Sequence, residues 1–232
     1  MKNLRHSKFD LNSNERSFPS IPTDAESFKK VLLAVDKERI SFVVQAYFRD
    51  RTPAAFSTNP MLWQALRNWL SSRISSIGGI AVSPWEWGLT GSATIGFSAS
   101  PNKFGIPFGE HSDIDLFVVN GELFNAIFEE AKKFSIAADN QSRYLAARDT
   151  LAGQLRRGFL IDTKHIPSVD AYRISSIVHN EISIIVDKLN IEGYRVKRSH
   201  VRAYRDWAAL ATQLKLNLSQ LREGLAASQN KA

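Results

Sequence analysis

The segment His111–Val119, with the sequence HSDIDLFVV, constrains the fold most. Its four consecutive apolar residues, 116–119, are typical of a strand buried on both faces. Side chains alternate along a strand, so Asp113 and Asp115 project together while Ile114 points to the opposite face. The segment predicts a buried strand with two carboxylates at its entrance, within an α/β (α+β) fold that has a mixed β-sheet core flanked by helices.

The acid pair itself indicates a cation. Two neighbouring carboxylates at the end of a buried strand repel each other, and their desolvation is unfavourable, so a divalent metal is the usual compensating charge. The alternative is an exposed strand end with both acids in water, because Asp-x-Asp is a common pattern.

A glycine-serine turn lies upstream of the acids. Gly91-Ser92 closes a short apolar segment, and residues 93–96 can begin a helix. Backbone N–H groups and a hydroxyl at a helix N-terminus favour phosphate oxygens. A phosphate-binding turn near a carboxylate pair supplies the parts for metal-assisted phosphoryl or nucleotidyl transfer.

With these residues the chain resembles the polymerase-β-like nucleotidyltransferase superfamily, whose pattern is an apolar residue, Gly-Ser, and a later Asp-x-Asp between hydrophobic residues. The matching positions are Gly91, Ser92, Asp113 and Asp115, and the resemblance covers about residues 80–120. It implies a nucleotidyltransferase-type sheet, Mg²⁺ or Mn²⁺ held by Asp113 and Asp115, and an NTP whose phosphates contact Gly91 and Ser92. The implied activity is transfer of NMP to an acceptor hydroxyl.

The spacing departs from that family pattern. Gly91 and Asp113 are 22 positions apart, about twice the separation that the superfamily often has. The additional residues, 97–110, contain two Pro and two Gly, which predicts an irregular loop anchored by its three phenylalanines. Lys103 in this loop either reaches a phosphate or is a solvated surface lysine.

The superfamily also has a third carboxylate on a separate strand, as a general base or metal ligand. Asp162 is our candidate because the apolar residues 159–161 lead directly to it, and Asp170 and Asp187 are weaker ones. The other interpretation of Asp162 is an acid that caps a turn near Thr163.

Several other chemistries are excluded. Residues 91–98 match the P-loop pattern except that Phe97 replaces the lysine that contacts the β- and γ-phosphates. The histidines lack H-E-x-x-H spacing, and the chain has no cysteine for thiolate sites or disulfides. No apolar run of about 18 residues or signal-like block is present, so we expect a cytoplasmic protein with no membrane partner.

The charge balance favours a polyanionic partner. The net charge is +7, and basic residues with interleaved tyrosines gather between 188 and 205. This stripe favours RNA, for example a tRNA 3′ end, as acceptor; the alternative is a solvated helix face. The predicted nucleic-acid contacts are Arg195, Lys197, Arg198, Arg202 and Arg205.

The resemblance leaves other acceptors open: a protein hydroxyl, as in a protein AMPylase, or a second nucleotide, as in a messenger synthase. Some small bacterial members act in antiviral defence or toxin–antitoxin systems, which makes such a role an expectation at family level. Two further interpretations are an inactive nucleotide- or RNA-binding module and a subunit of a larger complex with a protein partner.

We expect three regions: a polar arm over 1–22, a nucleotidyltransferase core with N-terminal helices over 23–165, and a C-terminal helical bundle over 166–232. The expected local elements are a helix start at the capping box Thr23–Glu26, a helix from Asn59-Pro60, a turn at 75–79, strand character over 80–89, helices over 122–134, 140–157 and 170–188, and a final helix over 196–225. Trp85 and Trp87 are expected to pack in the core or in a subdomain, and the alternative is that they stack on bases.

Overall fold

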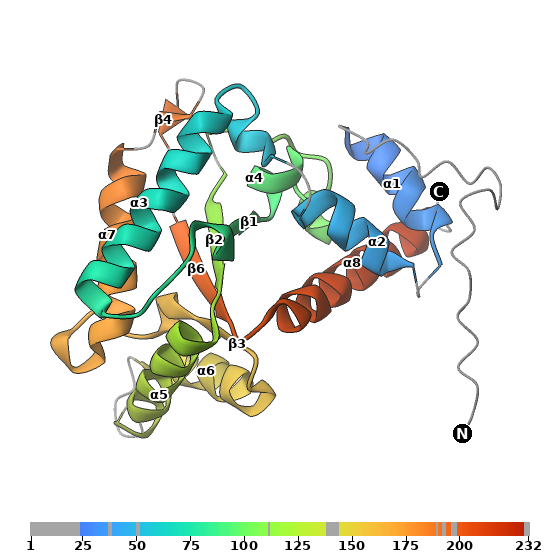
Figure 1. The fold of residues 1–232 in the computed structure, drawn as a ribbon. Coiled ribbons are helices and arrows are strands. Elements are labelled where there is room, and N and C mark those ends of the chain that lie inside the picture. Colours follow the sequence, from blue (N-terminus) through green and yellow to red (C-terminus); the bar gives the residue numbers. More distant parts are fainter. Residues whose placement is uncertain are drawn as a thin grey trace, which may run out of the picture.

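The computed structural model describes residues 24–36, 39–49, 52–110, 112–137, 144–188, 190–191, 194–195 and 199–229. Within this part of the chain a four-stranded mixed sheet forms the centre (Figure 1). Its order is β1 (Trp87–Thr90), β2 (Ile114–Val119), β6 (Ser199–Tyr204) and β3 (Leu160–Asp162). β2 runs parallel to β6, and the other two pairings are antiparallel. The predicted mixed sheet with flanking helices is confirmed at this level.

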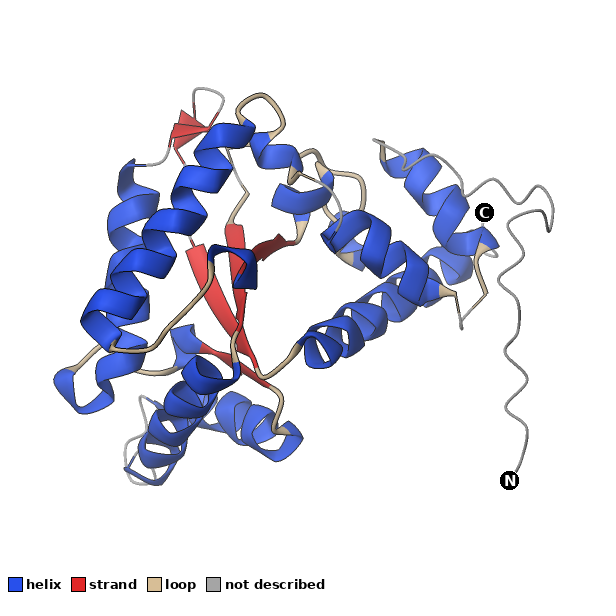
Figure 2. Ribbon diagram, viewed as in Figure 1, coloured by secondary structure: helices blue, strands red, loops and turns tan. Residues whose placement is uncertain are grey.

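One face of the sheet is closed by helices α3 (Pro60–Gly78), α5 (Gly121–Ala137), α6 (Leu145–Arg157) and α7 (Arg173–Lys188). Figure 2 shows these helices around the red strands. Every second residue of the strands contributes to this core, and the buried set includes Leu89, Ile114, Leu116, Val118, Ile161, Val201 and Ala203.

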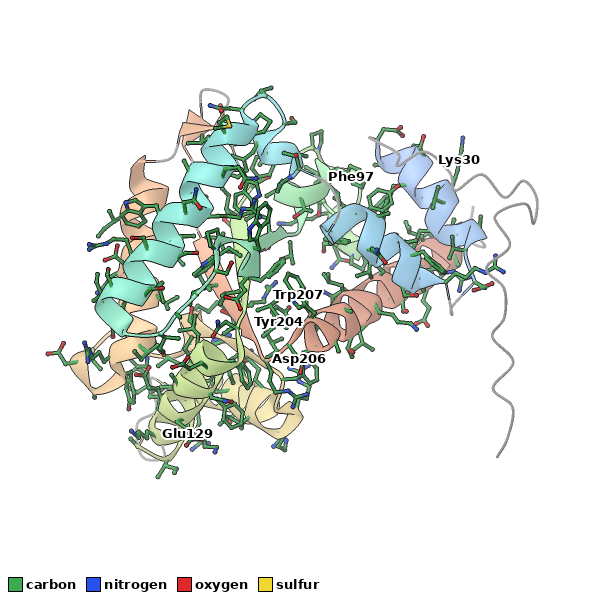
Figure 3. All side chains as sticks on the ribbon, in the orientation of Figure 1. Lys30, Phe97, Glu129, Tyr204, Asp206 and Trp207 are labelled. Carbon is green, nitrogen blue, oxygen red and sulfur yellow. The ribbon has the colours of Figure 1, made fainter. Side chains whose placement is uncertain are left out.

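The opposite face is closed over only part of its area. There α1 (Ala25–Ala34), α2 (Ile40–Val44) and α8 (Trp207–Gln229) form a second core with Phe117, Val119 and Tyr204. Figure 3 labels Tyr204 at the end of β6 and Trp207 at the start of α8. The Phe117 ring packs edge-on against both, with centroid distances of 6.2 and 6.3 Å.

Glycine at position 88 is required by this packing. A methyl group on Gly88 would lie 2.1 Å from the Phe117 ring, which is far inside van der Waals contact. Phe117 therefore lies directly over the backbone of β1. The neighbouring pair on the same face, Thr90 and Asp115, lies beyond the Phe117 ring and is not covered by it.

Several sequence predictions of helix ends agree with the structure. Asn59 caps α3 by accepting from the Leu62 N–H, with Pro60 in its first turn. Gly158 ends α6 with φ +68°, as expected for a glycine C-cap. α1 begins at the expected place, but its N-cap is Asp24, which accepts from the Ser27 N–H.

Other local predictions are wrong. The expected turn at 75–79 is helical as far as Gly78, and strand β1 begins only at Trp87. Trp85 is exposed and lies over the Arg67 guanidinium at 4.6 Å, while Trp87 is in the core as predicted. Short elements fill the connections: α4 (Ser92–Ile95), a π-helical turn (Gln45–Arg49), the strand pair β4 (Asn190–Ile191) and β5 (Tyr194–Arg195), and 3₁₀ turns at Ala54–Phe56, Pro84–Glu86, Pro101–Lys103, Thr163–His165 and Asp170–Tyr172.

The largest correction concerns the predicted final helix over 196–225. Residues 199–204 are strand β6, which lies between β2 and β3 in the sheet, and α8 begins only at Trp207. Val201 and Ala203 pack into the closed core, whereas Arg202 and Tyr204 face the other side. This alternation has the period of a strand, and the region after 165 therefore contributes a central strand as well as helices. Among the described residues, no helix has the length and apolar character needed to cross a bilayer.

Candidate active site

A cleft of about 650 Å³ opens over the uncovered part of the sheet. Its floor is formed by residues of β1, β2 and β6, its sides by the turn after β1 and the loop before β2, and its far wall by α8. Residues far apart in the sequence meet here, and both halves of the motif predicted from the sequence line this cleft.

The Gly-Ser turn lies directly against the acid-bearing strand. Thr90 pairs with Asp115 in the β1–β2 register, and Gly91 follows with φ +71°. A methyl group on Gly91 would lie 3.0 Å from Asp115 Oδ2, so only glycine combines this backbone conformation with this approach. Ser92 begins α4 and is half-buried at the cleft.

Asp113 and Asp115 both line the cleft, as alternation along the strand predicts. Asp113 is exposed, just before the first residue of β2, whereas the Asp115 side chain is 28% exposed. Ile114 between them is fully buried in the closed core. Strand geometry thus separates two functions at adjacent positions, with packing on one face and charge on the other.

The hydroxyl of Thr90 is an unsatisfied polar group at the floor of this cleft. Thr90 is 5% exposed, and its Oγ1 has no hydrogen-bond partner within the described part of the chain. Burying a hydroxyl without a partner is unfavourable, so such a group in a cleft points to a ligand or water.

Arg202 is the cation at the floor of the cleft. Its guanidinium lies 3.8 Å from Asp115 Oδ1 and 3.6 Å from Asp162 Oδ2, so it forms ion pairs with two acids on different strands. The sequence predicted Arg202 as a nucleic-acid contact on a helix. The strand pairing places it in β6, opposite Asp162, and corrects the helical placement, whereas the nucleic-acid contact stays a prediction.

Asp162, the predicted third catalytic acid, is not among the residues that line the cleft. Its side chain is 5% exposed, accepts from the Lys164 backbone N–H and pairs with Lys164 Nζ at 3.1 Å. Asp162 is the N-cap of the 3₁₀ turn Thr163–His165, which is the alternative that the sequence left open.

The loop 97–110 forms one side of the cleft. Phe97 is buried against Phe28 and Phe104, and its backbone forms a β-bridge with Pro107. The predicted aromatic anchoring is therefore confirmed for Phe97 and Phe104. Exposed Lys103 lines the cleft, as its predicted phosphate contact requires. Exposed Glu110 also lines it, an acid that no motif marks and that reaches the site only through the packing of the loop.

Helix α8 and the π-helical turn Gln45–Arg49 complete the far wall. Phe48, Leu214 and Leu218 give this wall an apolar character, and Asn217 and Gln220 add amide groups. No sequence motif marks these residues, because they come together only when the chain folds. The wall therefore combines apolar contact with hydrogen-bonding capacity, opposite the charged floor.

Tyr204 lies beneath the charged cluster on the same face of β6 as Arg202. Burial raises the pKa of Tyr204 to about 12, an effect that nearby Arg202 opposes and the carboxylates of Asp162 and Asp115 reinforce. The phenol is therefore neutral at physiological pH, and its buried ring supports the strand that carries Arg202.

The donors in the cleft fit Mg²⁺ or Mn²⁺. Hard divalent cations bind carboxylate oxygens and retain waters or phosphate oxygens as further ligands, so two carboxylates are sufficient. Asp113 and Asp115, which both line the cleft, would hold the cation. Throughout the described residues no cluster of three or more Asp, Glu, His or Cys could hold a metal without such additional ligands.

Of the remaining predicted residues, those whose side chains the structure describes lie outside the cleft. Arg205 is exposed and pairs with Asp206 at 2.9 Å, outside the cleft. Arg195 lies in β5, and its side chain, together with Lys197 and Arg198, lies outside the described residues. The alternative acid Asp170 is exposed at the start of a 3₁₀ turn and does not line the cleft, and the Asp187 side chain lies outside the described residues.

No protein-family model, curated protein or solved structure matches this chain significantly.

Proposed function

We propose that this chain is a metal-dependent nucleotidyltransferase that moves the nucleotidyl group of an NTP to an acceptor hydroxyl. The contact between the two motif halves supports this most: Gly91 lies against Asp115, and Ser92 and Asp113 line the same cleft. Donors suited to phosphate oxygens and carboxylates suited to a divalent cation thus meet at one place. The volume of about 650 Å³ is in the range of small-molecule sites.

In the proposed reaction the acceptor oxygen attacks the α-phosphorus of the NTP. A P–O bond forms to the acceptor, the bond from the α-phosphorus to the α–β bridging oxygen breaks, and pyrophosphate leaves with that electron pair. Ser92 and the Gly91 backbone hold the phosphates, and Lys103 adds a positive charge from the loop. A cation on Asp113 and Asp115 supplies neutralisation of phosphate charge when bound.

Glu110 replaces Asp162 as the candidate that accepts the proton from the attacking hydroxyl. It is exposed at the cleft, whereas Asp162 is buried beside Arg202 and committed to Lys164. A positioned general base contributes about 10²–10⁴-fold to such reactions. Glu110→Gln should therefore lower turnover by about 10²-fold without weakening nucleotide binding.

RNA is the acceptor that we propose to test first. The support is the net charge of +7, because the basic stripe that favoured RNA does not form one helical surface. A protein hydroxyl and a second nucleotide are the other acceptors, and a role in bacterial defence or a toxin–antitoxin pair depends on which of them is used.

The test is incubation of the protein with each α-³²P-labelled NTP, Mg²⁺ or Mn²⁺, and total bacterial RNA. We expect label on a polymer with the wild type and none with Asp113→Ala/Asp115→Ala. The control Asp36→Ala/Asp149→Ala removes the same charge from two exposed acids outside the cleft and should transfer normally. Label on protein or in a small oligonucleotide would identify the other acceptors, and equal transfer by both double variants would reject the proposal.

A non-catalytic nucleotide-binding module is the second candidate. The ion pair between Arg202 and Asp115 favours it, because this cation partly neutralises one of the two proposed metal ligands. Nucleotide binding that requires Asp115, with no transfer to RNA, protein or nucleotide under any of these conditions, would support this candidate.

A further inference from the structure

We infer that Arg202 binds the triphosphate chain of the substrate and that Asp162 is the positioning residue that holds Arg202 in place. This assignment rests on the proposed function and gives both residues roles different from those expected from the sequence. It starts from the location of a half-buried guanidinium at the floor of a cleft, 29% exposed, next to the proposed nucleotide site.

The two ion pairs of Arg202 are too long to be hydrogen bonds. The guanidinium lies 3.8 Å from Asp115 and 3.6 Å from Asp162, so both acids attract it electrostatically. Neither of these two carboxylate oxygens is close enough to accept a hydrogen bond from it. A phosphate group can take two parallel hydrogen bonds from a guanidinium, which is the geometry that arginine offers and lysine lacks.

The surroundings of Asp162 suit a residue that positions Arg202 rather than one that takes part in the reaction. Its carboxylate is buried, Lys164 neutralises it at 3.1 Å, and the register of β3 with β6 places it directly opposite Arg202. Arg202 is in turn fixed by the central position of β6, between β2 and β3. The backbone of β6 thus sets the direction of the Arg202 side chain, and Asp162 restricts the position of its guanidinium.

The charge balance of the cleft requires such a cation. A triphosphate brings several negative charges to a floor that already carries Asp113 and Asp115, so like-charge repulsion opposes binding. Arg202 offsets that repulsion, and the buried Thr90 hydroxyl beside this floor has no hydrogen-bond partner within the described residues. In the absence of the triphosphate, the same guanidinium competes with a divalent cation for Asp115.

This account predicts effects of opposite sign for one substitution. Arg202→Met keeps an unbranched side chain about as long as the arginine's aliphatic stem and removes the guanidinium with its charge and N–H groups. Tripolyphosphate in the presence of Mn²⁺ should bind about 10- to 100-fold more weakly, as expected for loss of charge-assisted hydrogen bonds. Mn²⁺ alone should bind about three- to tenfold more tightly, because the positive charge beside Asp115 is gone.

The measurements are calorimetry for tripolyphosphate and electron paramagnetic resonance for free Mn²⁺, with circular dichroism to verify folding. The control is Arg148→Met, which removes a 25%-exposed arginine paired with Asp149 at 3.6 Å, outside the cleft. Both affinities should stay unchanged in that variant. Should Arg202→Met not fold, Arg202→Lys decides: it keeps the charge, loses the planar fork, and should weaken tripolyphosphate severalfold with little change in Mn²⁺ affinity.

The role of Asp162 is tested with Asp162→Asn, which keeps an oxygen for the Lys164 backbone N–H and loses the charge. We expect weaker tripolyphosphate binding in the wild-type background and no further loss in the Arg202→Met background. A merely structural role for Asp162 would give equal losses in both backgrounds. That result would overturn the positioning assignment.

Tripolyphosphate binding by the wild type with the same affinity in Arg202→Met would overturn the inference alone, because the cleft would still hold a triphosphate. No binding of tripolyphosphate by the wild type, with or without Mn²⁺, would overturn the inference and the proposed function together.

Discussion

The two faces of the central sheet differ in how far they are covered. On one face the strand residues, among them Ile114, Leu116 and Val201, pack completely under α3, α5 and α7. On the other face α8 covers Phe117 and Tyr204 but leaves Asp115 and Arg202 at a cleft. The same strands therefore supply a rigid core on one side and a preorganised charged floor on the other. The closed face fixes the positions of the polar groups on the open one.

The largest expected effect is on the open face. Asp115→Asn removes a cation ligand while keeping the size of the side chain, so nucleotidyl transfer should fall by roughly 10³-fold. Because Asp115 lies at the cleft rather than in the core, the free energy of unfolding should change by less than about 1 kcal/mol. Labelled transfer and urea unfolding of the same preparation measure both. A large loss of stability with unchanged turnover would reverse the assignment of the two faces.

The neighbouring residue on the closed face provides the matched comparison. Leu116 is buried, so Leu116→Ala should lower the free energy of unfolding by about 2–5 kcal/mol through lost burial and a cavity. Turnover per folded molecule should stay within about twofold when it is measured well below the melting temperature. Urea unfolding gives the first quantity. A specific loss of turnover in a fully folded sample would show that the faces are not independent.

Gly91→Ala tests the junction between the turn and the acid strand. The φ of +71° and the 3.0 Å approach to Asp115 Oδ2 both oppose a side chain. We expect a loss of about 1–3 kcal/mol in stability from backbone strain and a displaced carboxylate. Transfer should fall more than stability alone explains, and Mn²⁺ affinity should fall with it. The control is Gly79→Ala, at a glycine with φ +73° that lies far from the acids in the sequence. This variant should lose as much stability as Gly91→Ala but bind Mn²⁺ normally.

Thr90→Val distinguishes a functional hydroxyl from a structural one. Valine has nearly the same shape, and removing an unsatisfied buried hydroxyl should leave stability equal or slightly higher. If the hydroxyl contacts a phosphate, tripolyphosphate affinity should fall by about tenfold, which corresponds to about 1.4 kcal/mol. Calorimetry and thermal unfolding check the two quantities. Reduced stability with unchanged affinity would place Thr90 in the core rather than in the site.

The smallest effect is the pH dependence that Tyr204 adds. Its pKa is about 12 in the folded protein against 10.0 for the ordinary phenol. The folded state therefore favours the neutral phenol, and this contribution is complete below pH 10 and is lost as the pH rises toward 12. Between pH 8 and 11 the wild type should lose about 1 kcal/mol more stability than Tyr204→Phe. Parallel loss in both proteins would show that Tyr204 titrates normally.

How far the sequence determined these features depends on whether the controlling interactions are local. The alternation of Asp113, Ile114 and Asp115 is a property of one strand, so the sequence predicted both acids on one side and the structure has them at the cleft. The caps at Asn59 and Gly158 are equally local. The specific nucleotidyltransferase core that the sequence suggests stays a prediction.

The roles of Arg202 and Asp162 depend on strand pairing between distant segments. β6 is short and basic, and its placement between β2 and β3 is decided by partners more than 35 positions away in the sequence. Only that pairing makes Arg202 a neighbour of two acids rather than a residue of a surface stripe. Glu110 and the α8 wall were missed for the same reason, since they become part of the site only when the loop and the helix pack over the sheet.

The most direct test of the central claim is to locate a cation in the cleft. Crystals grown with Mn²⁺ and, in turn, the non-hydrolysable α,β-methylene analogues of the four NTPs can be measured at the manganese absorption edge. We predict an anomalous peak between the carboxylates of Asp113 and Asp115, with the triphosphate extending from Gly91 and Ser92 toward Arg202. Clear density for a nucleotide elsewhere, or a manganese peak that avoids both aspartates, would contradict the account.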